Sequence, residues 1–351
     1  MSQQQELVDV QSYGFSPEAL QGIQVNEYAT SNWPLVYILS DGGTRRAYVG
    51  ETTDTLTRLG THLKHPEKGR LTAVHLISSE RFNKSATLDI ESSLIKYMAA
   101  DGQFSLMNGN LGLVDHNYYQ KEEMYSSIFR ENWDKLRAHG VAKHSLEVID
   151  NSDIFKYSPY KSLSVDQRKG LIKIMRALLH PGMKNLVVEG GAGTGKSVLA
   201  IFLFKLIHTD IAELDLREFS DEEAELRELL AEFKLRYPKP RMALVVPMNS
   251  FRKTLKRAFR NVAGLRAGMV IGPSDLARQS YDVVLVDESH RLRRRVNLGT
   301  YFGAFDKACE ALGLDKEKCS EVDWVVLQSK KAVFFYDPNQ TIKPSDACAS
   351  D

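Results

Sequence analysis

Gly190-Gly-Ala-Gly-Thr-Gly-Lys-Ser197 is a complete Gly-x4-Gly-Lys-Ser phosphate-loop motif. An apolar run at 185–189 precedes it, and a helical pattern of apolar residues at 198–207 follows it. This strand–loop–helix context favours a nucleotide-binding loop over a glycine-rich turn that only caps a helix. Such a loop directs backbone N–H groups, together with a helix N-terminus, at phosphate oxygens. The expected contacts to the nucleotide are Gly190, Gly191, Ala192, Gly193, Thr194, Gly195, Lys196 and Ser197.

Two residues of the loop also contribute side-chain chemistry. Lys196 is expected to reach the β- and γ-phosphates, and the Ser197 hydroxyl is expected to ligate Mg²⁺. The motif therefore predicts a site for a nucleoside triphosphate, which we take as ATP, together with Mg²⁺.

Two further strand-end motifs follow in order. Residues 281–286 read as a buried parallel strand that ends in Asp287 and Glu288. Asp287 is expected to hold Mg²⁺ through water, and Glu288 to orient the attacking water. A later strand, 331–336, ends in Asp337-Pro-Asn-Gln340, where Gln340 is placed to sense the γ-phosphate. A plain turn explains Asp-Pro-Asn equally well, because these residues favour turns.

Together these motifs resemble the first RecA-like lobe of superfamily-1 DNA/RNA helicases. The nearest resemblance is to an uncharacterised bacterial helicase-like family related to the Schlafen ATPases, whose members can carry an N-terminal nuclease domain. The resemblance implies a RecA-like lobe that contacts nucleic acid. It also implies that Gln167, in Ser164-Val-Asp-Gln167, reads the adenine. The alternative for Gln167 is a helix start with Ser164 as N-cap.

A second pattern lies in the first 115 residues. Two short apolar strands, 35–39 and 46–50, flank a Gly42-Gly43 pair. If that pair is a two-residue hairpin turn, Tyr37 lies directly opposite Tyr48 on one face of the sheet.

Polar residues follow this hairpin at spacings that suggest one site. Arg58 and His62 are four residues apart on an expected helix and so face the same way. A later helix, about 86–100, carries Glu91, and an Asn-Gly-Asn turn follows at 108–110.

This order resembles the GIY-YIG endonucleases over about residues 34–112. The resemblance implies that Tyr37, Tyr48, Arg58, His62 and Glu91 surround one scissile phosphate, with Asn108, or Asn110 in its place, as the closing asparagine. The triplets differ from the family pattern, since Leu35-Val36-Tyr37 replaces Gly-Ile-Tyr and Tyr48-Val49-Gly50 replaces Tyr-Ile-Gly.

These residue types suit phosphodiester hydrolysis. Glu91 offers one hard oxygen ligand for Mg²⁺, and Arg58 offers a planar fork for the phosphate. Tyr37 is placed to accept the proton of the attacking water, aided by His62 or Tyr48, provided that its pKa falls from about 10. Taken singly, each residue reads more readily as structural; the five matches in order are what favour a nuclease.

Composition and charge narrow the class of protein only modestly. The 351 residues carry a net charge of +1, so any basic surface for nucleic acid must be local. Arg252, Lys256 and Arg260 recur at helical spacing and form one candidate stripe. Three cysteines without a Cys-x-x-Cys spacing argue against a disulfide framework or a zinc site. No apolar run reaches membrane-spanning length, and we expect a cytoplasmic protein with no membrane partner.

The landmarks predict an α/β chain with four segments: an extension (1–33), a small α+β nuclease-type domain (34–115), a helical connector (116–160) and a RecA-like lobe with a mainly parallel sheet (161–351). An acidic insert, 213–232, reads either as a solvated helix or as a charge mimic that shields a basic groove. Only eleven residues follow Gln340, so a second RecA-like lobe is not expected. An arginine for the γ-phosphate would then come from a partner chain or a missing lobe.

The leading hypothesis is an ATP-regulated, metal-dependent endonuclease acting on nucleic acid, with DNA favoured over RNA. A role in defence against foreign DNA rests only on the frequent association of nuclease–ATPase fusions with defence. The alternative is a nucleotide-dependent nucleic-acid sensor or adaptor whose GIY-YIG-like module binds without cutting. Weak intrinsic ATPase activity is expected in either case.

Overall fold

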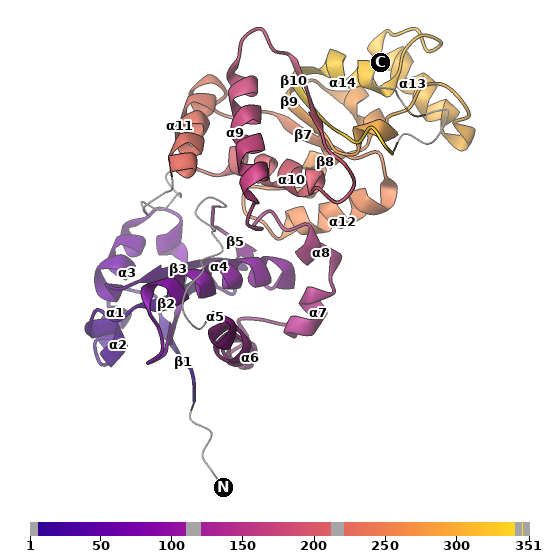
Figure 1. Ribbon diagram of the computed structural model, residues 1–351. Coiled ribbons are helices and arrows are strands. Elements are labelled where there is room, and N and C mark those ends of the chain that lie inside the picture. The colour runs from indigo at the N-terminus through magenta and orange to yellow at the C-terminus, as the bar shows by residue number, and fades with distance from the viewer. Residues whose placement is uncertain (1–5, 110–120, 212–220, 341–345, 347–351) are drawn as a thin grey trace. The chain divides into compact units, whose positions relative to one another are not determined.

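The computed structural model describes residues 6–109, 121–211, 221–340 and 346. The chain divides into two compact units, whose elements are labelled in Figure 1. The first unit comprises the chain up to Ser162, apart from 109–112, together with Asn261–Ala263. The second comprises Leu163–Arg260 and the residues from Gly264 onward.

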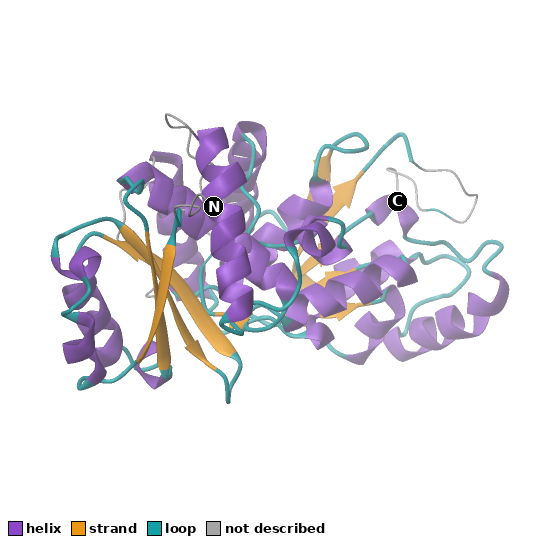
Figure 2. Ribbon diagram, turned by 90° about the horizontal axis from the view of Figure 1, so that it is seen from below, coloured by secondary structure: helices purple, strands orange, loops and turns teal. Residues whose placement is uncertain are grey.

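A five-stranded mixed sheet forms the centre of the first unit. Its strands are β1 (Asp9–Gly14), β2 (Leu35–Asp41), β3 (Arg46–Thr52), β4 (Ala73–Ser78) and β5 (Ser105–Leu106). Their order is β1-β4-β2-β3-β5, and the β3–β5 pair is parallel whereas the other pairs are antiparallel. Figure 2 shows helices against both faces of these strands. Central strand β2 is accordingly buried from Leu35 to Ser40.

Capping residues define several of the helix ends in this unit. The helices are α1 (Ala19–Ile23), α2 (Glu27–Thr30), α3 (Thr55–Lys64), η1 (Lys68–Arg70), α4 (Lys84–Asp101), α5 (Lys121–Glu123), η2 (Met124–Phe129), α6 (Arg130–Ala138), α7 (Leu146–Asp150) and α8 (Asp153–Lys156). The Asp54 carboxylate accepts the Thr57 N–H at the start of α3, and the Asn83 side chain caps α4 in the same way. Helix α4 ends at Gly102, whose φ of 71° suits a glycine C-cap.

The β2–β3 hairpin differs from the predicted register. Asp41 pairs with Arg46, so the connection holds four residues and Tyr37 pairs with Gly50, not with Tyr48. The Asp41 carboxylate explains the longer turn, because it accepts both the backbone N–H (2.7 Å) and the hydroxyl of Thr44. The shift is two residues, and since side chains alternate with period two, both tyrosines stay on one face. Tyr48 is therefore the diagonal neighbour of Tyr37.

The second unit contains a parallel sheet, as the sequence predicts. Its strands are β6 (Asn185–Glu189), β7 (Met242–Val245), β8 (Val270–Ile271), β9 (Tyr281–Val286) and β10 (Ser329–Tyr336), in the order β6-β10-β9-β7-β8. Every pairing in the sheet is parallel. Strand β10 lies between β6 and β9, so Asp337 follows the strand that separates the phosphate loop from Asp287. All three strand ends share one edge of the sheet.

Helices and short 3₁₀ segments cover this sheet. They are α9 (Val165–Leu179), α10 (Lys196–His208), α11 (Asp221–Arg236), α12 (Asn249–Arg260), η4 (Ala267–Met269), η5 (Pro273–Arg278), η6 (Ser289–Arg291), η7 (Gly299–Tyr301), α13 (Phe302–Leu312) and α14 (Glu321–Gln328). Residues Leu199–Ile207 of α10 are all buried. An apolar cluster including Phe305 and Trp324 joins α13 and α14 to β9 and β10. Within the described residues, no helix combines the length and apolar character needed to cross a bilayer.

Of the acidic insert (213–232), residues 213–220 lie outside the described residues, and helix α11 contains the rest. Helix α11 buries Leu226, Leu230 and Phe233 and packs beside α9, as Figure 1 shows. Glu225 forms an ion pair with Arg176 of α9. These contacts show a helix packed against α9, and they do not test the choice between a solvated helix and a charge mimic for the insert as a whole.

Candidate functional sites

The phosphate loop has the backbone conformation that its glycines predict. Gly193 and Gly195 have φ values of 76° and 83°, in the left-handed region that favours glycine. Gly195 is the N-cap of α10, so Lys196 and Ser197 open that helix. The N-terminal N–H groups of α10 therefore lie beside the loop, an arrangement suited to an anion.

Lys196 connects the loop to the third strand-end motif. Its Nζ donates to the carbonyl oxygens of Gly190 (2.7 Å) and Gly191 (2.8 Å). It also lies 3.3 Å from Asp337 Oδ2, and the Gln340 side chain donates to the same oxygen at 3.0 Å. The predicted phosphate-binding lysine and the predicted γ-phosphate sensor thus share one buried carboxylate.

Asp287 is fully buried at this edge of the sheet, with 0% of its surface exposed. Burial raises its pKa to about 6, against the opposing effect of the Ser197 hydroxyl. Its Oδ2 has no hydrogen-bond partner among the described residues. A buried carboxylate oxygen next to a serine hydroxyl is the donor set that a hydrated Mg²⁺ uses. The described residues contain no cluster of three or more His, Cys, Asp or Glu side chains that could bind a metal by themselves.

Glu288 occupies a strained backbone position. Its φ of 52° is left-handed, which costs about 1 kcal/mol or more in a non-glycine residue and is frequent at functional sites. His290 Nε2 lies 3.0 Å from the Glu288 carboxylate and lowers its pKa. Glu288 is therefore held in the ionised form that the orientation of a water molecule requires.

Gln167 has a structural role that the sequence alternative anticipated. Ser164 caps α9 and forms a reciprocal capping box with Gln167. The Gln167 Nε2 also donates to the carbonyl of Thr194 at 3.1 Å. A Cβ on Gly195 would lie 2.2 Å from that nitrogen, so Gly195 also lets Gln167 approach the loop. The adenine-reading role of Gln167 stays a prediction.

One member of the predicted cationic stripe is used within the protein. The Arg252 guanidinium donates to the Val246 carbonyl at 2.8 Å and to the Asn249 side chain. It also packs over Gly272, where a Cβ would lie 2.4 Å from Nη1. Arg252 therefore anchors α12 to the end of β7, whereas Arg260 of the same helix is exposed.

In the first unit, four of the residues assigned by the nuclease resemblance lie together. The Tyr37 hydroxyl lies 2.7 Å from His62 Nε2, and Arg58 Nε donates to the same hydroxyl at 3.3 Å. The Tyr48 ring packs against the His62 ring at a centroid distance of 5.1 Å, and its centroid is 6.4 Å from that of Tyr37. Two strands and one helix thus bring a phenol, an imidazole and a guanidinium to one point.

Glu91 is buried on α4, with 2% of its surface exposed. Helix α4 packs against β2 and β3, the two strands that carry Tyr37 and Tyr48. One buried carboxylate suits a single Mg²⁺ that keeps most of its water ligands.

Asn108 supports the site through the backbone. Its side chain accepts the Val49 N–H at 3.0 Å and donates to the Val49 carbonyl at 2.8 Å. These two bonds fix β3 next to Tyr48, which makes Asn108 a positioning residue. Asn110, its predicted substitute, lies outside the described residues.

Two residues of this site were not expected from the sequence. Lys68 is buried, and its Nζ lies 3.6 Å from the centre of the Tyr48 ring. Gly50 lies beneath Tyr37, because a Cβ there would be 2.3 Å from the Tyr37 hydroxyl. The Tyr48-Val-Gly50 triplet contains a signal for Gly50, whereas nothing in the sequence around Lys68 marks it.

Part of the second unit matches a known protein family. Residues 183–350 match the family described as Schlafen group 3, DNA/RNA helicase domain. The matched segment contains β6, the phosphate loop, Asp287 and Asp337. The second unit thus contains a helicase-like, Schlafen-related lobe, which suggests nucleotide binding and a function that involves nucleic acid. No curated protein matches the chain.

Proposed function

We propose that this protein is an ATP-binding, metal-dependent endonuclease in which the helicase-like lobe regulates a GIY-YIG-type phosphodiesterase. The observation that carries the proposal is the cluster of Tyr37, Arg58 and His62 around one phenolic oxygen. A phenol is a weak base at neutral pH, and both of its neighbours act to change that.

The chemistry at Tyr37 follows from its two contacts. Arg58 donates to the phenolic oxygen and so favours the phenolate. His62 Nε2, in the tautomer that accepts, receives the phenolic proton along the 2.7 Å contact. Tyr37 can then take a proton from the attacking water. A Mg²⁺ ion on Glu91 would lower the pKa of that water and stabilise charge on the phosphate.

The helicase-like lobe would supply the switch. The phosphate loop, Lys196 and Asp287 support binding of ATP with Mg²⁺, and Glu288 supports its hydrolysis. We propose DNA as the substrate and defence against foreign DNA as the setting. An arginine finger from a partner chain would raise the low ATPase rate expected of this chain.

A second candidate function is a nucleotide-dependent sensor that binds nucleic acid without cutting it. The observation that favours it is burial: Tyr37 is 0% and Tyr48 is 3% exposed. A scissile phosphate must reach these groups for catalysis, whereas a binding module needs only the surface around them.

Nicking of supercoiled plasmid by the purified full chain tests the proposal. We expect Mg²⁺-dependent nicking that changes with ATP and that falls at least 100-fold in Glu91→Ala and Tyr37→Phe. Glu147→Ala, which removes an exposed carboxylate, is the matched control and should nick like the parent. Absence of nicking by a parent chain that still binds ATP would favour the sensor. A cellular effect that survives Glu91→Ala but not Lys196→Ala would favour it as well.

A further inference from the structure

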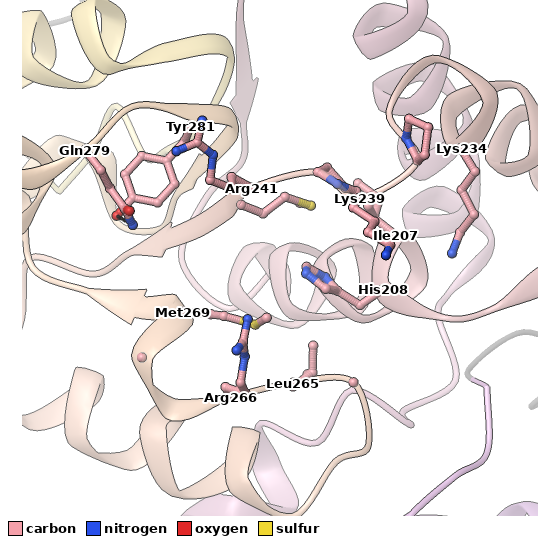
Figure 3. A pocket seen from close by; sticks show the side chains of 15 residues that line it. Ile207, His208, Lys234, Lys239, Arg241, Leu265, Arg266, Met269, Gln279 and Tyr281 are labelled. Atoms are coloured by element: carbon pink, nitrogen blue, oxygen red, sulfur yellow. Dashed lines mark hydrogen bonds between the residues drawn. The ribbon is translucent and has the colours of Figure 1, made fainter. Parts of the chain in front are cut away.

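Figure 3 shows a pocket of the second unit, with a volume of about 980 Å³. Met242 and Tyr281, the first residues of β7 and β9, line it. The phosphate loop and Asp287 instead follow the ends of strands. Because the strands are parallel, starts and ends lie at opposite edges of the sheet. The six residues of β9 separate the two edges by roughly 17 Å.

The rim of the pocket is cationic. Its basic lining residues are His208, Lys234, Lys239, Arg241 and Arg266. Of the described residues that line it, none is Asp or Glu. Figure 3 shows Arg241 on one side of the opening and Arg266 on the other. Both side chains are exposed, so the rim presents its positive charge to solvent and to ligands.

Asp282, the acid next to the rim, already has partners within the protein. Asp282 follows Tyr281 on β9, and its carboxylate lies 2.8 Å from Lys330 Nζ. Its other oxygen accepts the backbone N–H of Arg241 at 2.8 Å. Asp282 is thus committed to Lys330 and to the main chain, and the guanidinium of Arg241 is left to act on a ligand.

The interior of the pocket combines apolar surface with one acceptor. Ile207, Leu265, Met242 and Met269 supply the apolar surface. The His208 ring stacks on Phe204 and contacts the Phe204 carbonyl through Nδ1 at 2.8 Å. Burial, with nearby cations, lowers the pKa of His208 to about 4, so the ring is neutral at pH 7. With Nδ1 donating, Nε2 is an acceptor, and Figure 3 shows the ring pointing into the pocket.

We propose that this pocket is a second binding site, specific for a phosphorylated nucleotide and separate from the phosphate loop. The phosphates contact Lys239, Arg241 and Arg266 at the rim. A ribose hydroxyl or base amino group donates to His208 Nε2, and the base packs on the methionines. The volume lies within the range of sites for ligands of this size. Inorganic phosphate would satisfy the rim alone, and an apolar ligand would satisfy the interior alone.

Two kinds of ligand present a phosphate next to a ribose and a base: a free nucleotide and the 5′-phosphorylated end of a nucleic-acid strand. Calorimetric titration of the full chain with the Lys196→Ala substitution tests both, because that substitution removes binding at the phosphate loop. One arm uses ADP; the other compares a short 5′-phosphorylated DNA single strand with its 5′-hydroxyl counterpart. We expect binding in at least one arm, weakened at least tenfold by adding Arg241→Ala with Arg266→Ala.

Two further variants separate ligand contact from loss of charge or fold. Lys307→Ala with Lys318→Ala removes two exposed cations elsewhere on the unit and should bind like the parent. Gly268 lines the pocket, and no atom lies within 4 Å of a Cβ built on it, so Gly268→Phe should block the site without loss of charge. Failure of the Lys196→Ala chain to bind any probe would overturn the proposal. Equal affinity in the Arg241→Ala, Arg266→Ala variant would do so too. Neither result bears on plasmid nicking, so the proposed nuclease stands or falls separately.

Discussion

Gly50 leaves room for the Tyr37 side chain, which passes over its backbone. The Tyr37 hydroxyl and ring carbons occupy the space of a Cβ at this position, with the nearest atom at 2.3 Å. The backbone of Gly50 is in a regular strand, so its role is to leave room and not to adopt an unusual φ. The strand pairing of Tyr37 with Gly50 places the phenolic oxygen within reach of His62 and Arg58.

Gly50→Ala should therefore destabilise the first unit and displace Tyr37. Overpacking of this kind costs about 1–3 kcal/mol. Urea denaturation measures the free energy of unfolding, and Gly60→Ala in α3 is the control, because no atom lies within 4 Å of its added Cβ. An unchanged stability of Gly50→Ala, with nicking activity retained, would contradict this account.

Glu321 is a buried acid that makes the stability of the second unit depend on pH. Its carboxylate accepts the Tyr301 hydroxyl at 2.8 Å and the Arg293 N–H at 2.9 Å. Burial nevertheless raises its pKa from 4.5 to about 7. Between pH 4.5 and about pH 7, the Glu321 carboxyl is therefore protonated in the folded state and ionised in the unfolded state. Its contribution to stability is present below pH 4.5 and is lost as the pH rises through about 7.

Glu321→Gln should remove this dependence. Relative to the variant, the parent should lose up to about 3 kcal/mol of stability between pH 5 and pH 8. The fluorescence of buried Trp324, three residues away on α14, can follow unfolding of this unit. Parallel stability curves for the two proteins over that range would show that Glu321 does not titrate as described.

At the level of elements, the hairpin shows what the sequence could and could not predict. The two strands, and the shared face of Tyr37 and Tyr48, follow from alternation of apolar residues. The register does not, because Gly42-Gly43 suits a tight turn and the Asp41 carboxylate selects a four-residue one. Gln167 is similar: the sequence predicts a helix start with Ser164 as N-cap, but the bond from Gln167 to Thr194 depends on how α9 packs on the loop.

Asn108 is a second element-scale feature, since one side chain continues the pairing of β3. Asn108→Ala should cost about 1–3 kcal/mol, because it leaves the buried N–H and C=O of Val49 without partners. Urea denaturation measures the loss, with the exposed Asn151→Ala as the control. If Asn108 only positions β3, nicking by Asn108→Ala should fall in proportion to its folded fraction. A loss of activity in fully folded protein would instead show that Asn108 acts on the reaction, through the alignment of Tyr48 or directly.

For the whole molecule, the phosphate loop and the basic pocket lie in the same unit, yet the sequence predicts them unequally. The phosphate loop, Asp287 and Asp337 are close in space because parallel strands end at one edge, a rule that can be applied to sequence alone. The basic pocket cannot be predicted in this way. Its lining extends from Ile207 to Tyr281 and combines the ends of helices and strands with three connections between elements.

ATP with Mg²⁺ should stabilise the second unit by mass action. At 100 times Kd the gain is about 2.7 kcal/mol. Differential scanning fluorimetry should show a rise in the melting temperature of the parent with ATP and Mg²⁺, and a smaller rise when EDTA removes the metal. Lys196→Ala should abolish the part of the shift that EDTA removes; a full metal-dependent shift in that variant would place ATP elsewhere.

The amide of Asn108 has a consequence beyond the candidate nuclease site. Strand β5 pairs with β3 only at Arg46 and Ala47, so the rest of β3 would present free peptide groups at the border of the sheet. Exposed strand borders recruit strands from other molecules and initiate aggregation. By occupying both peptide groups of Val49, Asn108 imitates one further residue of a neighbouring strand. The same side chain that aligns Tyr48 therefore also fills the place at Val49 that a strand of another molecule would need.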